Sequence, residues 1–237
     1  GEIDTVRALR ARGTLVMVPT HSSNLDSILV GFALHRLGLP PFTYGAGLNL
    51  FQNRLVGWFM HHLGAYKVDR TKQAPVYKEV LKSYAGCTME LGYPNLFFPG
   101  GTRSRSGGVE QRLKLGLLGM GLDAFVRRLR AGTKNPDVFV VPLTINYQLV
   151  LEAETLIDDW LKETGKSRYI IVDDEFSRMD RVLDFARRLF ALESRVTLRL
   201  GNPLDVFGNI VDAQGVSRDA RGRRPVHLSE RAGAAGR

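Results

Sequence analysis

The sequence has little cysteine and lacks long apolar segments. Cys87 is the only cysteine among 237 residues, which excludes an internal disulfide and suits a reducing compartment. There is neither a Cys-x-x-Cys pair nor a histidine spacing typical of metal sites, so we expect no metal. No apolar run reaches the roughly 18–20 residues that cross a bilayer, and no signal peptide is visible. Because the chain starts at Gly1 and not at methionine, we expect it to be a piece of a longer protein.

The composition that remains is that of a folded, basic protein. Hydrophobic residues make up 44% and charged residues 24%, which is typical of a globular chain long enough for one large α/β domain or two small ones. The net charge of +9 suits nucleic acid, an anionic membrane surface or a phosphorylated ligand. Because no known nucleic-acid-reading module is recognisable, the charge favours a membrane or phosphate partner and no nucleic acid.

Apolar strands alternate with amphipathic helices along most of the chain. We expect strands at 15–18, 42–44, 65–68, 95–98, 138–141 and 195–200, and helices at 2–12, 26–37, 48–63, 74–91, 113–129 and 180–192. The alternation predicts an α/β fold with a mostly parallel central sheet covered by helices on both faces. From Gly208 the sequence is polar and rich in Gly and Arg. We therefore expect one domain over 1–207 and a polar, poorly ordered tail over 208–237.

Four segments stand at the ends of predicted strands, at 21–26, 64–70, 97–107 and 140–147. In open α/β sheets, ligands bind in the crevice beyond the carboxyl ends of the strands. We therefore expect these four segments to form one site.

His21 and Asp26 are the candidate catalytic pair. An imidazole that titrates near pH 6.5 can take a proton from an alcohol, and a neighbouring carboxylate can orient the ring. The two residues can meet if His21 lies in the turn and Asp26 in the first turn of the following helix. The alternative interpretation is a helix cap beside a solvated histidine.

The loop 97–107 is the candidate phosphate site. Its glycines let the backbone approach an anion, and its arginines and hydroxyls can donate to phosphate oxygens. A solvated basic loop is the alternative. For Arg70 the alternative is a surface residue paired with Asp69. The aromatic residues of 48–63, such as Phe51, Trp58 and Phe59, suit either a membrane interface or core packing, and core packing is favoured.

Taken together, the four segments resemble the motif blocks of the glycerolipid acyltransferase family. The family blocks are His-x4-Asp, Gly-x5-Arg, Phe-Pro-Glu-Gly-Thr-Arg-Ser and a Val-Pro strand. In this chain they match residues 21–26, 64–70, 98–104 and 140–143, in the same order and with similar spacing across 15–147. The Arg-Ser-Arg-Ser-Gly run at 103–107 resembles the glycerol-3-phosphate branch. Two positions depart from the family: Gly100 replaces the Glu of the third block, and Asp69 replaces a second Arg.

The resemblance implies an O-acyltransferase with a glycerol-3-phosphate acyltransferase-like fold. His21 would be the base and Asp26 its orienting partner, and the other implied site residues bind substrate: Arg70, Gly101, Thr102, Arg103, Ser104 and Arg105. The acceptor would be glycerol 3-phosphate, with lysophosphatidate as the alternative, and the acyl donor would be acyl-CoA or acyl carrier protein. No further cofactor is expected. The resemblance also implies an anionic membrane surface as partner, at the cytoplasmic face. Because Gly100 departs from the family, a catalytically impaired lipid-binding relative is a further alternative.

Overall fold

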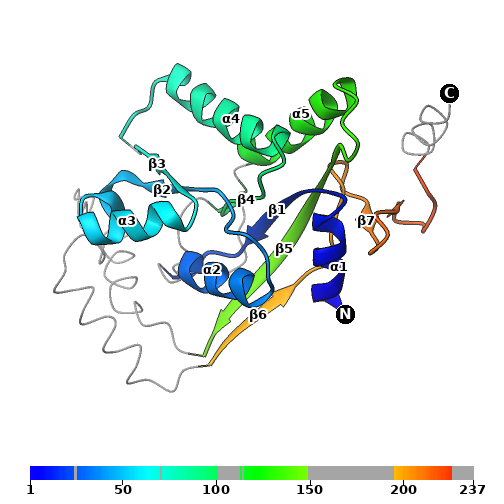
Figure 1. The fold of residues 1–237 in the computed structure, drawn as a ribbon, viewed down its shortest axis with the longest axis horizontal. Helices are drawn as coiled ribbons and strands as arrows, with labels where there is room; N and C mark the ends of the chain where they lie inside the picture. Colours follow the sequence, from blue (N-terminus) through cyan, green and yellow to red (C-terminus); the bar gives the residue numbers. More distant parts are fainter. Residues whose placement is uncertain (24–25, 70, 101–112, 114, 149–194, 226–237) are drawn as a thin grey trace, which may run out of the picture.

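In the computed structural model, the described residues are 1–23, 26–69, 71–100, 113, 115–148 and 195–225 (Figure 1). Helices and strands alternate through most of this part of the chain, as predicted. In chain order they are α1 (Glu2–Arg10), β1 (Gly13–Pro19), α2 (Asp26–Arg36), β2 (Tyr44–Gly47), the 3₁₀ helix η1 (Leu48–Phe51), α3 (Arg54–His62), β3 (Ala65–Val68), α4 (Pro75–Glu90), β4 (Asn95–Leu96), α5 (Gly116–Arg130), β5 (Asp137–Tyr147), β6 (Val196–Leu200), β7 (Ile210–Val211) and β8 (Ser217–Arg218).

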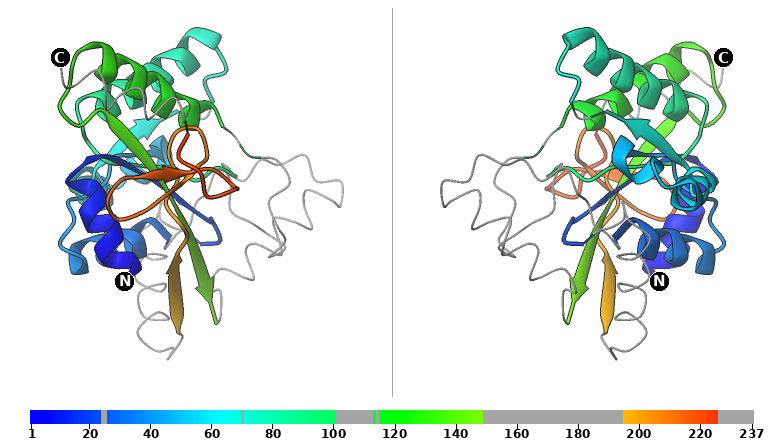
Figure 2. Two further views of the ribbon diagram at one scale, coloured as in Figure 1. Left: turned by 90° about the vertical axis from the view of Figure 1, so that its right-hand side faces the viewer. Right: turned by 90° about the vertical axis from the view of Figure 1, so that its left-hand side faces the viewer.

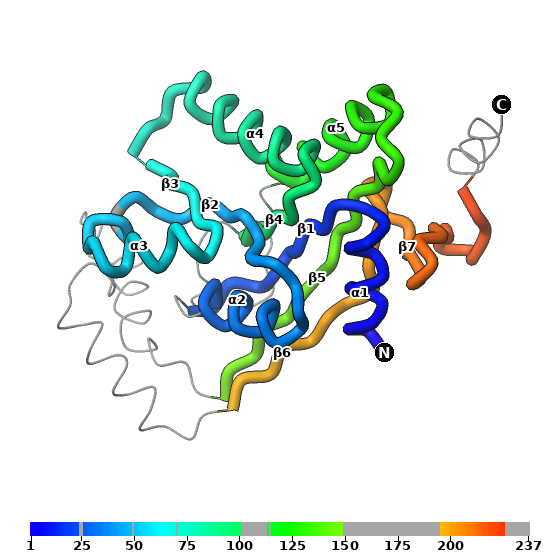
Figure 3. Tube along the Cα trace, in the orientation of Figure 1, coloured from blue at the N-terminus to red at the C-terminus, as the bar shows by residue number. Residues whose placement is uncertain are grey.

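The central sheet has the strand order β4-β1-β5-β6. Strand β1 runs parallel to both of its neighbours, and β6 runs antiparallel to β5. The register from Gly13 opposite Asp137 to Pro19 opposite Leu143 places β1 and β5 side by side, although they are far apart in sequence (Figure 3). The fold is therefore α/β with a mostly parallel sheet, as predicted.

The parallel pair β2-β3 continues the sheet beyond β4. Thr43 forms a parallel bridge with Asn95, and the Leu96 amide donates a 2.9 Å hydrogen bond to the Thr43 carbonyl. Because β1 to β5 all run in the same direction, their carboxyl ends lie along one edge of the sheet. This is the arrangement expected from the four segments at the ends of the predicted strands.

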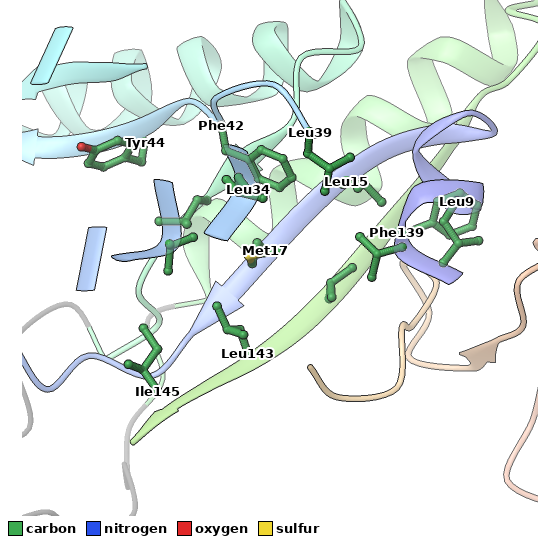
Figure 4. Packing of buried hydrophobic residues seen from close by; sticks show 14 of the residues in the cluster. Leu9, Leu15, Met17, Leu34, Leu39, Phe42, Tyr44, Phe139, Leu143 and Ile145 are labelled. Atoms are coloured by element: carbon green, nitrogen blue, oxygen red, sulfur yellow. The ribbon is translucent and has the colours of Figure 1, made fainter. Parts of the chain in front are cut away.

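Helices cover both faces of the sheet, because side chains alternate between the faces along each strand. Leu15 and Met17 of β1 belong to a core with residues of α1 and α2. Val16, between them, belongs to a second core with residues of α4 and α5. Figures 1 and 2 show these two helix layers, and Figure 4 shows the packing of the first core around Phe139.

The predicted helix 48–63 is two helices. Asn53 has extended backbone angles, and its side-chain Oδ1 accepts hydrogen bonds from the amides of Leu55 and Val56, at 3.0 and 3.2 Å. An asparagine that caps a new helix competes with continuation of the previous one. The prediction was therefore wrong at Asn53, where the chain leaves η1 and begins α3.

Strand β5 is longer than the predicted strand 138–141, because Pro142 does not end it. The Pro142 carbonyl accepts a 2.8 Å hydrogen bond from the Gly201 amide. Beyond this point the strand continues to Tyr147, paired with β6. The prediction missed this extension because the antiparallel partner lies about fifty residues later in the sequence.

The polar segment predicted to be a poorly ordered tail contains ordered structure in its first part. Strands β7 and β8 pair antiparallel, and Val211 is buried within the core that contains Leu15. The Asp212 carboxylate accepts hydrogen bonds from the amides of Gln214 and Val216. A buried apolar anchor and a side-chain-stabilised turn therefore order this segment despite its polar composition. Residues 226–237 of the predicted tail and the predicted helix 180–192 lie outside the described residues.

Candidate active site

Strand β1 delivers His21 to the carboxyl edge of the sheet, and Thr20 holds it there. The Thr20 amide donates to the Leu143 carbonyl at 2.9 Å. The Thr20 hydroxyl accepts from the Ile145 amide, also at 2.9 Å. Both partners belong to β5, so the turn that carries His21 is tied to the neighbouring strand.

Asp26 is the first residue of α2, and the structure brings it to His21 as predicted. Its Oδ2 atom lies 2.8 Å from His21 Nδ1 and accepts the amides of Ser22 and Ser23 at 2.7 and 2.9 Å. The side chain is fully buried. Asp26 thus places its carboxylate at the N-terminal end of α2, which carries a positive partial charge.

Tyr147 supplies a further hydrogen bond to this carboxylate from the far end of β5. Its hydroxyl donates to Asp26 Oδ1 at 2.5 Å. Each oxygen of Asp26 therefore has a donor, and the plane of the carboxylate is held between β5 and the turn after β1. Of the two oxygens, Oδ2 is the one that faces His21.

The protonation of His21 follows from this contact. An ionised carboxylate can only accept a hydrogen bond, so Nδ1 carries the proton and donates to Asp26. In the neutral ring Nε2 then keeps its lone pair, and among the described residues it has no hydrogen-bond partner. The ring stacks on Phe98, with centroids 4.1 Å apart, and 18% of the side chain is exposed. The His21 ring is therefore held by Asp26 and Phe98, remains partly exposed, and is not a freely solvated histidine.

The predicted substrate-binding residues lie outside the described residues: Arg70, Gly101, Thr102, Arg103, Ser104 and Arg105. The residues next to them are described. Phe98, at the start of the third block, contacts the His21 ring. Asp69 follows β3 and accepts hydrogen bonds from the Thr71 hydroxyl and amide, which hold the pKa of Asp69 below its usual value. The alternative pairing of Asp69 with Arg70 stays untested.

An apolar pocket of about 340 Å³ lies between α2 and α3. Its lining includes Ser27, directly after Asp26, and Leu96, two residues before Phe98. Phe32 and Phe59 line it as well, and both are also exposed at the surface. The pocket is therefore open to the surface formed by α2 and α3, and its described lining includes neither His21 nor Asp26.

Sequence reasoning missed the roles of Tyr147 and Phe98, although both lie in segments that were assigned to the site. The signal for Tyr147 was its place after the Val-Pro strand. Its hydrogen bond to Asp26 spans 121 residues, and it depends on the pairing of β1 with β5. The sequence near Tyr147 and the sequence near Asp26 do not predict that contact.

Comparison with known proteins places this site in a family. The model of the family described as Acyltransferase matches residues 2–146, which is more than half of the chain. The chain is 30% identical over 232 residues to a glycerol-3-phosphate acyltransferase of Pseudomonas putida (strain W619), covering 96% of this chain and 26% of the relative. It is 32% identical over 203 residues to a glycerol-3-phosphate acyltransferase of Ectopseudomonas mendocina (strain ymp), covering 85% of this chain and 23% of the relative.

The chain thus spans about a quarter of the length of these curated relatives. Among solved structures it is similar to the 1-acyl-sn-glycerophosphate (LPA) acyltransferase PlsC from Thermotoga maritima, with 19% identity and a TM-score of 0.45, covering 83% of this chain and 57% of that chain. The matched residues 2–146 contain His21, Asp26 and the strands that position them. This chain belongs to the acyltransferase family.

Proposed function

We propose that this chain is the acyl-transfer domain of a glycerol-3-phosphate acyltransferase, the enzyme of the first acylation in phospholipid synthesis. The observation that carries the proposal is the buried Asp26 carboxylate, which holds the His21 ring through Nδ1 while 18% of the His21 side chain stays exposed. Relatives named glycerol-3-phosphate acyltransferase, similar over most of the chain, support the choice of acceptor.

The chemistry uses one base and a good leaving group. His21 Nε2 takes the proton of an acceptor hydroxyl as the oxygen attacks the carbonyl carbon of an acyl thioester. Asp26 stabilises the imidazolium that forms. The carbon–sulfur bond then breaks, the thiolate takes the proton back from His21, and an ester and a free thiol result. No covalent enzyme intermediate, metal or prosthetic group is needed, since the co-substrate acyl-CoA or acyl carrier protein supplies the activated acyl group.

The two substrates would enter from different sides. The acceptor phosphate would be bound by Arg70, Arg103 and Arg105, and backbone donors near Gly101 and Thr102 would stabilise the oxyanion. The contact of Phe98 with His21 supports placing the loop that follows it at the site. The apolar pocket between α2 and α3 has the size and lining of a ligand site, and we assign it to the acyl chain.

We further propose that the domain works at the cytoplasmic face of a membrane. The support is the net charge of +9, since the cytoplasmic leaflet carries a negative surface potential. Among the helices that the structure describes, none combines the length and the apolar character that spanning a bilayer demands.

The test is acyl transfer by the purified chain. Labelled glycerol 3-phosphate and 1-acylglycerol 3-phosphate would each be offered with acyl-CoA and with acyl carrier protein as donors. We expect ester formation on glycerol 3-phosphate, and a fall in kcat of about 10²–10⁴ for His21→Ala. His61→Ala, at an exposed histidine of α3, is the matched control and should leave kcat unchanged.

Three outcomes would contradict the proposal in distinct ways. Equal turnover by His21→Ala would exclude His21 as the base. A preference for the acylated acceptor would assign the chain to the second acylation. Binding of acyl-CoA without turnover on either acceptor would favour the alternative of a catalytically impaired lipid-binding relative, which the replacement of the family Glu by Gly100 suggests.

A further inference from the structure

Helices α2 and α3 expose a group of large apolar side chains on the surface beside the pocket. On α3, Leu55, Trp58 and Phe59 recur at the spacing of one helical face. Phe32 of α2 and Leu48 of η1 are exposed as well, and the exposed fractions of these five side chains run from 43% to 63%. Phe32 and Phe59 line the same pocket, so the two helices contribute to one continuous region. We call these five residues the α2–α3 apolar surface.

The exposure of this surface is not explained by packing within the described chain. In α3 only Met60 is buried, so most of the helix serves no core. The prediction of core packing was therefore wrong for Trp58 and Phe59, whereas Phe51 does pack against the first core. Contiguous exposed apolar patches on proteins mark interfaces with proteins, ligands or membranes.

The segment that carries this surface has fixed charges of one sign. The segment 27–68, which contains α2, η1 and α3, has no Asp or Glu, although these residues make up 24 of the 237 in the chain. It has three fixed cations, all exposed: Arg36, Arg54 and Lys67. An apolar surface with cations and no carboxylates is complementary to an apolar layer under anionic headgroups.

We infer that the α2–α3 apolar surface docks on an anionic lipid bilayer, with Trp58 and Phe59 at the boundary between headgroups and acyl chains. Aromatic side chains are favoured at that depth. His62 packs against Trp58, with ring centroids 4.2 Å apart, and its Nδ1 lies 2.7 Å from the Trp58 carbonyl. The outward ring of Trp58 is therefore held against the helix.

Docking in this orientation turns the pocket toward the lipid. Phe32 and Phe59 lie at its exposed side, and Ser27, next to Asp26, lies along its lining. An acyl chain could then pass from the bilayer into the pocket without crossing water. The inference builds on the proposed membrane association and names the surface that makes it, but vesicle binding itself requires no turnover.

The test uses the purified chain and vesicles of phosphatidylcholine alone or mixed with phosphatidylglycerol. We expect co-flotation with the anionic vesicles that weakens with added salt. Leu55→Ser/Trp58→Ser should weaken the partition roughly tenfold to a hundredfold, since two large apolar side chains lose their burial. Val76→Ser/Val80→Ser is the matched control, because these residues of α4 are also exposed and apolar but lie beside Glu79.

A second measurement reports on depth. The chain has two tryptophans, so a Trp160→Phe background leaves Trp58 as the only reporter. Its emission should shift to the blue on anionic vesicles and be quenched by brominated lipid chains. His21→Ala should bind vesicles like the parent, which separates loss of docking from loss of acyl transfer.

Equal flotation of the two double variants, or Trp58 emission unchanged by bound vesicles, would overturn the inference. So would a concentration-dependent dimer, seen by sedimentation without any vesicle binding and abolished by Leu55→Ser/Trp58→Ser. That result would assign the same surface to a second copy of the chain.

Discussion

Replacing Tyr147 with phenylalanine tests whether the hydrogen bond to Asp26 positions the catalytic pair. The variant keeps the ring and removes only the hydroxyl that donates to Oδ1. A hydrogen bond to a charged group contributes about 1.5–3 kcal/mol, and about 1.4 kcal/mol changes a rate tenfold. If that energy holds the carboxylate in place, kcat should fall roughly tenfold to a hundredfold. KM should change little, because the hydroxyl contacts Asp26 and not the substrate.

The assay is steady-state acyl transfer, with the thermal midpoint of each variant measured in parallel. Tyr84→Phe is the matched control, at an exposed tyrosine of α4 whose ring packs on Tyr66. In an Asp26→Ala background, Tyr147→Phe should cause no further loss, since Tyr147 acts through Asp26. An equal loss in both backgrounds, or no loss in the parent, would refute the positioning role.

Three further predictions concern stability. Gly64→Ala should lower the free energy of unfolding by about 1–3 kcal/mol or more, because Gly64 has φ +88° and an added Cβ would lie 2.5 Å from the Phe42 carbonyl oxygen. Denaturant titration measures this, and an unchanged midpoint would contradict it. Burial raises the pKa of Tyr44 from 10.0 to about 12, so the stability that neutral Tyr44 contributes is complete below pH 10 and is lost as the pH rises toward 12. The thermal midpoint should therefore fall over this pH range, and it should fall less steeply in Tyr44→Phe. Arg128→Met should lower the free energy of unfolding by about 1–3 kcal/mol, because the buried guanidinium donates to the carbonyls of Met89 and Asn135. An unchanged thermal midpoint in calorimetry would refute this.

Local sequence patterns were sufficient to predict the helices and strands whose formation depends on residues close in sequence. Strands β1 and β3 and helices α2 and α4 lie close to their predicted ranges, because their periodicity and their end signals are contained within each segment. The pairing of His21 with Asp26 was predictable for the same reason. Both residues belong to one strand-to-helix turn, and only a few backbone arrangements connect such elements.

Predictions failed where a distant partner decides the outcome. Strand β5 passes Pro142 because β6 pairs with its second half. The polar segment after Gly208 is ordered in part because Val211 reaches the core. Neither partner can be read from the segment itself, since the free energy comes from contacts that exist only after the sheet has formed.

The sequence by itself determined which groups are available: an imidazole and a carboxylate in one turn, a segment with cations and no carboxylates, and motif blocks in a recognisable order. The tertiary structure decided how they are used. Pairing β1 with β5 brings Tyr147 to Asp26, the position of β4 brings Phe98 against His21, and packing leaves the outer face of α3 uncovered by the described residues. These contacts join residues far apart in sequence, so the packing of whole elements sets them and no local preference does.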